Sequence, residues 1–129
     1  AKVAMGSSPN QTIKAFEEAE SYHGPSLIIA YSPCIAHGID MTQGLTQQDL
    51  AVKSGMWPLY RYNPALAEAG KKPLKLDSKE ASIPLIDYMK GENRFRLLLQ
   101  QDTEMAEAQL AGLEADIAEQ RKQFELLAS

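Results

Sequence analysis

The chain's only cysteine, Cys34, lies in the segment SPCIAHG at residues 32–38, directly after an apolar run at residues 26–31. An apolar run of this length predicts a buried strand, and the ends of strands in open α/β sheets open into ligand crevices. A thiol in such a place can ligate a metal or act as a nucleophile. It can also be a small buried residue, because free cysteine is among the most buried residue types. The residues alone leave these three roles of Cys34 open.

His37 follows Cys34 by three residues, a spacing compatible with a shared metal or a Cys/His pair. A zinc or nucleophilic site needs further ligands or an orienting acid. The only other histidine, His23, precedes the apolar run. We therefore expect His37 to pack within its loop or to support a neighbouring ligand from there. The polar segment at residues 92–94 predicts hydrogen-bonding groups at a surface or a domain boundary.

A strand, a helix and a second strand are predicted before Cys34. Residues 3–5 form a short apolar segment that predicts the first strand. Ser8, followed by Pro9, predicts the start of a helix. Residues 26–31 are apolar on both faces, which predicts a strand buried on both sides in a parallel sheet. Such a unit cannot cover both sheet faces alone, so we expect a larger sheet to complete it. The expected inner stripe of the helix is Ile13, Phe16 and Ala19.

After the cysteine loop, the sequence predicts a short helix capped by Thr46 and ended by Gly55. Residues 57–62 and 73–76 predict two strands joined by a turn region. From Pro84 onward the composition favours helix, with a long terminal helix that we expect to pack on a larger protein and to support a dimer contact. Its predicted stripe is Ala106, Leu110, Leu113, Ile117, Gln120, Phe124 and Leu127.

Composition and charge narrow the class of protein. The chain has 129 residues, 44% hydrophobic and 23% charged, which is typical of at most one soluble globular domain. The formal net charge of −4 disfavours nucleic-acid binding, and no apolar run is long enough to cross a bilayer. A single cysteine excludes an internal disulfide framework, and the first residues lack a secretory signal pattern, so we expect a cytoplasmic location. The lysines at 71, 72 and 75 predict a solvated loop, with a docking patch for an acidic electron carrier as the alternative.

Five segments, in one order from residue 3 to residue 95, resemble the C-terminal portion of pyruvate:ferredoxin (flavodoxin) oxidoreductase. They are residues 3–6 with 11–16, 24–38, 51–64, 76–79 and 92–95. The resemblance covers nearly the whole chain. Because the family's enzyme is a very long multidomain polypeptide, the resemblance implies that this chain is a fragment, inactive by itself.

The resemblance also implies cofactors and partners. Enzymes of the family decarboxylate pyruvate on thiamine diphosphate with Mg²⁺, pass electrons through iron–sulfur clusters to ferredoxin or flavodoxin, and transfer the acetyl group to coenzyme A. The Gly-Asp-Gly motif that holds the thiamine lies upstream in the family and is absent from this chain. Cys34 matches the last of four thiolate ligands to a 4Fe-4S cluster near the thiamine. The resemblance implies a homodimer built with the remainder of the parent enzyme.

The expected fold class is α/β: a strand-helix-strand piece of a thiamine-diphosphate-binding fold, followed by a mostly helical C-terminal extension. We place the boundary at residue 44, with residues 1–44 in the thiamine-binding domain and residues 45–129 in the extension. Two alternatives stay open. The chain could be a free-standing helical interaction module, or the parent enzyme could act on another 2-oxoacid.

Overall fold

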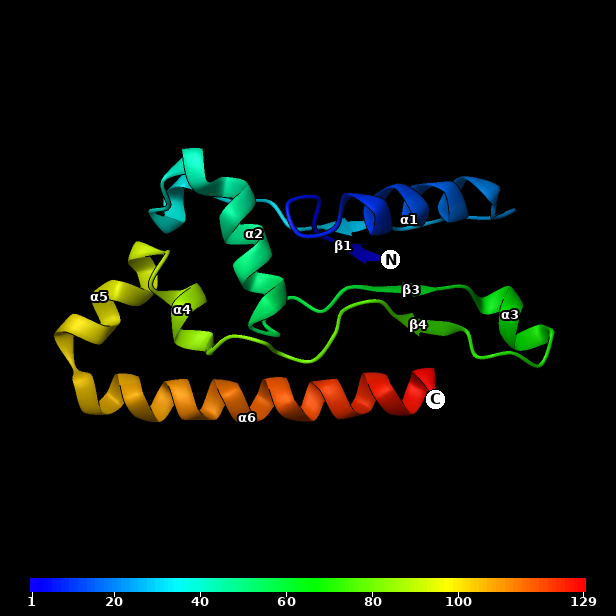
Figure 1. Ribbon diagram of the computed structural model, residues 1–129. Helices are drawn as coiled ribbons and strands as arrows, with labels where there is room; N and C mark the ends of the chain where they lie inside the picture. The colour runs from blue at the N-terminus through cyan, green and yellow to red at the C-terminus, as the bar shows by residue number, and fades with distance from the viewer.

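Four short strands form one mixed sheet in the computed structural model, which describes residues 1–129 (Figure 1). The strand order is β2-β1-β3-β4. Strand β1 (Lys2–Val3) pairs parallel with β2 (Ile29–Ala30) and antiparallel with β3 (Tyr60–Tyr62). Strand β4 (Leu74–Leu76) completes the sheet antiparallel to β3, which confirms the predicted strand pair. The sheet thus joins strands from both sides of residue 44.

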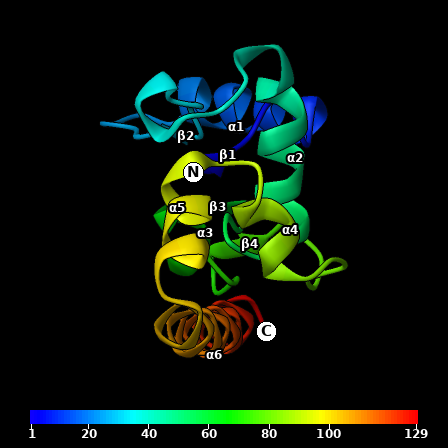
Figure 2. The same cartoon turned by 90° about the vertical axis from the view of Figure 1, so that its left-hand side faces the viewer.

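Helix α1 (Pro9–Ser21) connects β1 to β2, so the predicted strand-helix-strand unit is confirmed. The helix begins where the sequence indicates, because the Ser8 hydroxyl accepts a hydrogen bond from the Gln11 N–H at 3.4 Å and Pro9 occupies the first turn. Figures 1 and 2 show α1 on one side of the sheet and the long helix α6 (Thr103–Ala128) on the other.

The predicted inner stripe of α1 is wrong at two of its three positions, and only Ala19 is half-buried. Ile13 and Phe16 are 53% and 57% exposed, whereas Gln11 and Ala15 are buried. Gln11 turns inward because its side-chain amide donates to the Lys2 carbonyl at 3.3 Å and also reaches a carboxylate near β4. Polar pairing, not apolar spacing, sets the rotation of α1, and its apolar side chains face outward.

The segment around β2 is not buried on both sides within these residues. Only Ile29–Ala30 join the sheet ladder, and β2 is an edge strand with one neighbour. Leu27 is 73% exposed and Ile29 is 43% exposed. An exposed apolar edge strand invites further pairing, so this edge of the sheet lacks the cover that the sequence predicts.

Two 3₁₀ turns, η1 (Ile35–His37) and η2 (Met41–Gln43), lead from β2 to helix α2 (Gly44–Lys53). The predicted cap at Thr46 is wrong, because α2 begins two residues earlier, directly after η2. The Asp40 carboxylate caps η2 instead, accepting from the Thr42 N–H at 2.9 Å. The end of α2 agrees with the prediction, since Gly55 follows it in the left-handed conformation at φ 81°.

The remaining helices are α3 (Pro64–Glu68), within the β3–β4 connection, α4 (Leu85–Met89) and α5 (Asn93–Gln101). Helices α2 and α4 meet at the main core cluster, whose buried members are Ala51, Leu85, Tyr88 and Met89. Side chains of α6 pack against this cluster from the side opposite α1 (Figure 2). None of the helices has the length and hydropathy that a membrane-spanning segment needs.

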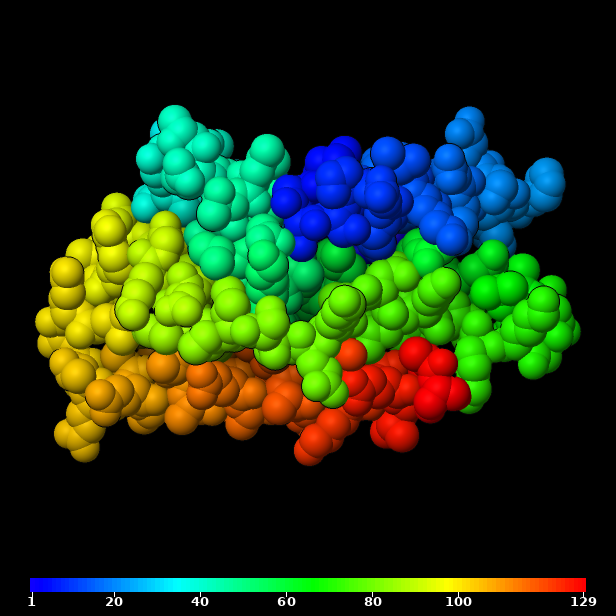
Figure 3. All heavy atoms as spheres, viewed as in Figure 1, coloured from blue at the N-terminus to red at the C-terminus, as the bar shows by residue number.

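The long terminal helix is confirmed, and it forms a straight layer along one side of the molecule (Figure 3). Its predicted stripe is correct as far as Ile117 and wrong at two later positions. Gln120 and Leu127 are exposed, and Arg121 and Ala128 turn toward the sheet in their place. The Arg121 guanidinium donates to the backbone carbonyls of residues 78 and 79 at 2.8 and 2.9 Å, which fixes α6 to the loop after β4.

Candidate functional site

Cys34 lies in the turn that follows β2, at the point where the sequence places it. Its backbone is extended, with φ −126° and ψ 127°, and its carbonyl accepts from the His37 N–H at 3.0 Å to close η1. Its thiol is free and its side chain is half-buried. The thiol is therefore reachable from outside these residues, unlike that of a cysteine sealed in a core.

The amides of this turn are available to an outside ligand. Gly38 donates its N–H to the Ile35 carbonyl at 2.9 Å, but the N–H groups of Ile35 and Ala36 make no hydrogen bond within the chain. Free N–H groups are expected at the first positions of a helical turn. His37 shares the turn with the cysteine, while His23 lies apart, beyond the end of α1. No cluster of three or more His, Cys, Asp or Glu side chains is positioned to hold a metal ion, so the chain offers a single thiol.

The end of the cysteine turn packs tightly on the start of α5. Gly38 has φ 69°, and a Cβ added to it would lie 2.4 Å from the Cβ of Asn93. The Asn93 N–H donates to the Gly38 carbonyl at 3.2 Å. Position 38 therefore requires glycine for its backbone conformation and for the close approach of the two segments.

A buried polar cluster lies between Tyr31, just before the cysteine turn, and the start of α5. Glu92 is fully buried, and its Oε1 accepts from the Tyr31 hydroxyl at 3.1 Å and the Gln47 amide at 3.3 Å. Its Oε2 accepts from Arg94 Nε at 2.5 Å. The Tyr31 and Tyr88 hydroxyls are hydrogen-bonded at 3.1 Å. These five side chains, Tyr31, Gln47, Tyr88, Glu92 and Arg94, are called the Glu92 cluster below.

The sequence predicts two positions for residues 92–94, a surface or a domain boundary. The surface is wrong for Glu92, whose hydrogen bond with Tyr31 crosses the boundary predicted at residue 44. Asn93 and Arg94 are exposed as predicted, but the carboxylate between the turn and the core is closed off from solvent. Its partners lie 45 and 61 residues away along the chain, at Gln47 and Tyr31. No local spacing pattern signals such a cluster, so only the fold reveals it.

Electrostatics keep the tyrosines of the Glu92 cluster neutral. Burial, followed by the hydrogen bond with Tyr88, raises the pKa of Tyr31 far above its usual range, and burial likewise raises the pKa of Tyr88. Burial alone lowers the pKa of Arg94, but the ion pair with Glu92 outweighs it and the net shift is upward. Both phenols therefore act as hydrogen-bond donors at neutral pH, and Arg94 supplies the compensating positive charge.

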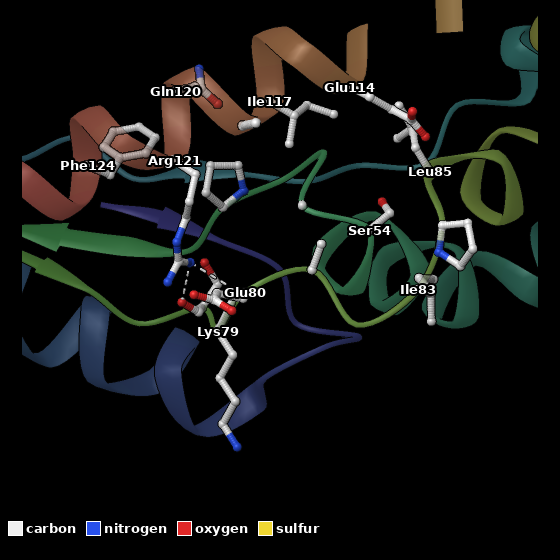
Figure 4. Close-up of a pocket in the computed structure, with 16 residues that line it drawn as sticks. Ser54, Lys79, Glu80, Ile83, Leu85, Glu114, Ile117, Gln120, Arg121 and Phe124 are labelled. Atoms are coloured by element: carbon white, nitrogen blue, oxygen red, sulfur yellow. Dashed lines mark hydrogen bonds between the residues drawn. The ribbon is translucent and has the colours of Figure 1, made fainter. Parts of the chain in front are cut away.

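The pocket in Figure 4 is separate from this site. It measures about 290 Å³ and lies between α6 and the loop that joins β4 to α4. Ile83, Ile117 and Phe124 give it a largely apolar wall, and Arg121 points across it to the loop carbonyls that it binds. Its lining includes no cysteine or histidine, so it offers no nucleophile or metal ligand of those kinds.

Known proteins similar to this chain match it from end to end. No protein-family profile matches. The chain is 48% identical over 129 residues to the pyruvate-flavodoxin oxidoreductase of Nostoc sp., in an alignment that covers 100% of the chain and 11% of that relative. It is 50% identical over 128 residues to the pyruvate:ferredoxin oxidoreductase of Moorella thermoacetica, covering 99% of the chain and 11% of that relative.

The chain belongs to the pyruvate:ferredoxin (flavodoxin) oxidoreductase family. It is a fragment of such an enzyme, since it spans about 11% of the length of these two relatives. A shorter match, 48% identical over 87 residues, joins it to the mitochondrial pyruvate dehydrogenase (NADP⁺) of Euglena gracilis, covering 66% of the chain and 5% of that relative. The family membership inferred from five sequence segments is thus confirmed.

The lysines at 71, 72 and 75 are exposed and form no ion pair in this oxidoreductase segment. They lie between the end of α3 and the middle of β4. That is the solvated loop that the sequence predicts. Docking of an electron carrier at this loop stays a prediction.

Replacing Gly38 by alanine is expected to loosen the cysteine turn of the oxidoreductase. The left-handed conformation costs a non-glycine residue roughly 1–2 kcal/mol, and the new Cβ would also displace Asn93. Hydrogen exchange of the full-length enzyme should show faster exchange in peptides that span residues 33–40.

Gly70→Ala is the matched control. Gly70 has the same φ of 69°, but a Cβ there meets no atom within 4 Å. It carries the conformational cost without the clash, so Gly38→Ala should have the larger local effect. Equal effects of the two substitutions would show that the contact with Asn93 is unimportant.

Proposed function

We propose that this chain is the C-terminal segment of an enzyme that oxidatively decarboxylates pyruvate. Pyruvate, coenzyme A and two oxidised one-electron carriers give acetyl-CoA, CO₂, one proton and two reduced carriers. The observation that carries the proposal is the 48–50% identity over essentially the whole chain to relatives named for pyruvate and for flavodoxin or ferredoxin. The fragment itself lacks the thiamine motif and is proposed to be inactive alone.

Cys34 is proposed as one ligand of a 4Fe-4S cluster. Such a cluster takes one thiolate per iron and supplies one-electron transfer when bound. The half-buried free thiol and the unpaired N–H groups of Ile35 and Ala36 fit this role, since amides near a ligating sulfur stabilise its charge. The other three thiolates, thiamine diphosphate and Mg²⁺ belong to the remainder of the enzyme.

The surface of the segment supports its incorporation into a larger body. Only 19 of 129 residues are buried, a small core for a chain of this size. Leu27 and Ile29 at the β2 edge and Phe16 on α1 are exposed apolar side chains. We propose that the thiamine-binding domain of the parent enzyme covers this side, with residues 1–44 as its final part.

Residues 45–129 are proposed as the extension that follows. The outer face of α6, which carries Leu126 and Leu127 at 74% and 60% exposure, is available for the contact of the proposed homodimer. The enzyme is proposed to act in the cytoplasm, where reduced thiols and low-potential carriers coexist.

Turnover of the full-length enzyme with a panel of 2-oxoacids tests this function. With coenzyme A and either ferredoxin or flavodoxin as acceptor, pyruvate should give acetyl-CoA and reduced carrier, with the highest kcat/KM of the panel. Omission of coenzyme A is the control and should prevent acetyl-CoA formation. A higher kcat/KM for a different 2-oxoacid would overturn the pyruvate assignment, and reduction of neither carrier would overturn the electron-transfer assignment.

A further inference from the structure

We propose that Glu92 is a positioning residue for the Cys34 turn, holding the thiolate in the geometry that the cluster requires. This inference rests on the proposed role of Cys34 as a ligand. Two consecutive residues at the start of α5 hold the two ends of the loop that contains the cysteine. Glu92 binds the Tyr31 hydroxyl before Cys34, and Asn93 binds the Gly38 carbonyl after it.

The contact at the first end of the loop is fixed by burial. Glu92 is 0% exposed and Tyr88 is 1% exposed, so water cannot replace the hydrogen bonds of the carboxylate without opening the core. Tyr31 is further held from the other side, because its ring packs edge-on against Trp57 with centroids 5.2 Å apart. The Trp57 indole N–H in turn donates to the Val3 carbonyl at 3.0 Å. Rotation of Tyr31 away from Glu92 would thus disturb the sheet as well.

Helix α2, which contacts the Glu92 carboxylate at the start of α5, also supports the cysteine turn. Gln47 of α2 donates to Glu92 Oε1 at 3.3 Å and to the Tyr88 carbonyl at 3.0 Å. The first residue of α2, Gly44, lies against Pro33, the residue next to Cys34, where an added Cβ would meet the proline ring at 3.4 Å. The Glu92 carboxylate at the start of α5 therefore binds both Tyr31, which follows β2, and α2, whose first residue lies against Pro33.

Cluster ligands respond to such support. Partners that orient a metal ligand are worth about 10–100-fold in metal affinity or activity. In Glu92→Gln the side chain keeps its size, but the amide cannot balance Arg94, and one of its two polar atoms becomes a donor. We expect the carboxylate contacts to Tyr31 and Arg94 to weaken and the cysteine turn to become mobile.

The test follows cluster retention in the full-length enzyme. The difference in iron content between the unmodified enzyme and Cys34→Ser identifies the cluster to be measured. In Glu92→Gln, release of that iron to a ferrous chelator should be about 10-fold faster than in the unmodified enzyme. The electron paramagnetic resonance line shape and the midpoint potential of the same cluster should also change. Tyr31→Phe removes only one hydroxyl and should act in the same direction with a smaller effect.

Asp77→Asn is the control for general destabilisation. Asp77 belongs to a separate ion-pair network, with Arg61 and Gln11, that includes no residue of the Glu92 cluster. The Asp77→Asn substitution should lower the melting temperature of the enzyme without changing iron release or the cluster spectrum. A Glu92→Gln enzyme with a lowered melting temperature but unchanged iron release, spectrum and potential would overturn the inference.

Tyr31→Phe keeps the inference open to refutation if Glu92→Gln fails to fold, because unchanged iron release in Tyr31→Phe would also overturn it. The proposed ligand and the proposed positioning residue fail in different ways. If Cys34→Ser retains all of its iron, the ligand assignment is wrong and the inference falls with it. If Cys34→Ser loses iron and Glu92→Gln does not, only the inference is wrong.

Discussion

The full-length enzyme with Cys34 replaced by serine is expected to lose one four-iron cluster and to form acetyl-CoA from pyruvate more than about 100-fold more slowly. Even partners that merely orient a metal ligand are worth about 10–100-fold, and loss of a ligating thiolate should exceed that. Serine keeps nearly the same size in a half-buried position, so the fold of the turn should survive. The measurement is iron content per chain together with acetyl-CoA formation under anaerobic conditions.

His37→Asn is the control from the same turn. The His37 side chain is half-buried and forms no ion pair with an acidic side chain, so its replacement should leave the iron content unchanged. This pair of variants separates the ligand assignment from the Cys/His alternative. Unchanged iron and unchanged electron transfer in Cys34→Ser would refute the assignment, and equal losses in both variants would indicate disturbance of the turn as a whole.

Sequence periodicity predicts the existence of the terminal helix but misplaces the end of its inner stripe. The predicted stripe follows a heptad repeat and reaches Gln120 and Leu127, whereas the inward residues are Arg121 and Ala128. A straight α-helix has 3.6 residues per turn and drifts against a strict 3.5-residue repeat. Over three heptads the drift amounts to about 60°, more than half of the roughly 100° between neighbouring residues, so the inward side shifts toward the next residue. The guanidinium of Arg121 tolerates its inward position because two loop carbonyls accept from it.

The rotation of α1 could not be predicted from its own residues. Its apolar spacing favours Ile13 and Phe16, yet Gln11 is the buried residue because one of its partners, Asp77, lies 66 residues away. Long-range polar contacts of this kind leave no periodic signal. The same limitation hides the Glu92 cluster, whereas the place of Cys34 directly after β2 follows from a local signal, an apolar run that ends in a turn.

The network that rotates α1 also joins it to the sheet. Arg61 on β3 is 7% exposed, and its Nε and Nη2 each donate to an oxygen of Asp77 at 2.8 Å. Glu18 of α1 contacts a third nitrogen of the guanidinium, and Gln11 donates to Asp77 at 3.1 Å. Fork-to-fork geometry makes this a strong, charge-assisted pair. The helix that leads to β2 is therefore tied to β3 mainly through one buried cation.

Asp77→Asn should loosen this connection strongly. Breaking a buried pair by removing one charge costs about 3–5 kcal/mol, and because Glu18 still balances Arg61 we expect about 3 kcal/mol. That figure corresponds to roughly 100-fold faster hydrogen exchange in peptides of α1 and β3 in the full-length enzyme. Glu119→Gln is the control, since the Glu119–Lys122 pair is a solvent-exposed helix pair worth only about 0.2–0.5 kcal/mol. Similar exchange rates in the two variants would show that the buried pair stabilises α1 and β3 no more than an exposed pair does.

The same pair predicts a dependence on pH with a definite sign. Burial alone raises the pKa of Asp77, but the hydrogen bonds from Arg61 and Gln11 outweigh it and hold the pKa below its ordinary value. A carboxyl whose folded pKa is below its unfolded value of about 3.9 adds stability above that pH and loses it as the pH falls through the folded value. After correction for intrinsic exchange, the difference between the unmodified enzyme and Asp77→Asn should stay constant from about pH 7 to pH 5 and shrink below about pH 4. A difference that grows on acidification would contradict the assignment of Asp77 as the ionised partner of Arg61.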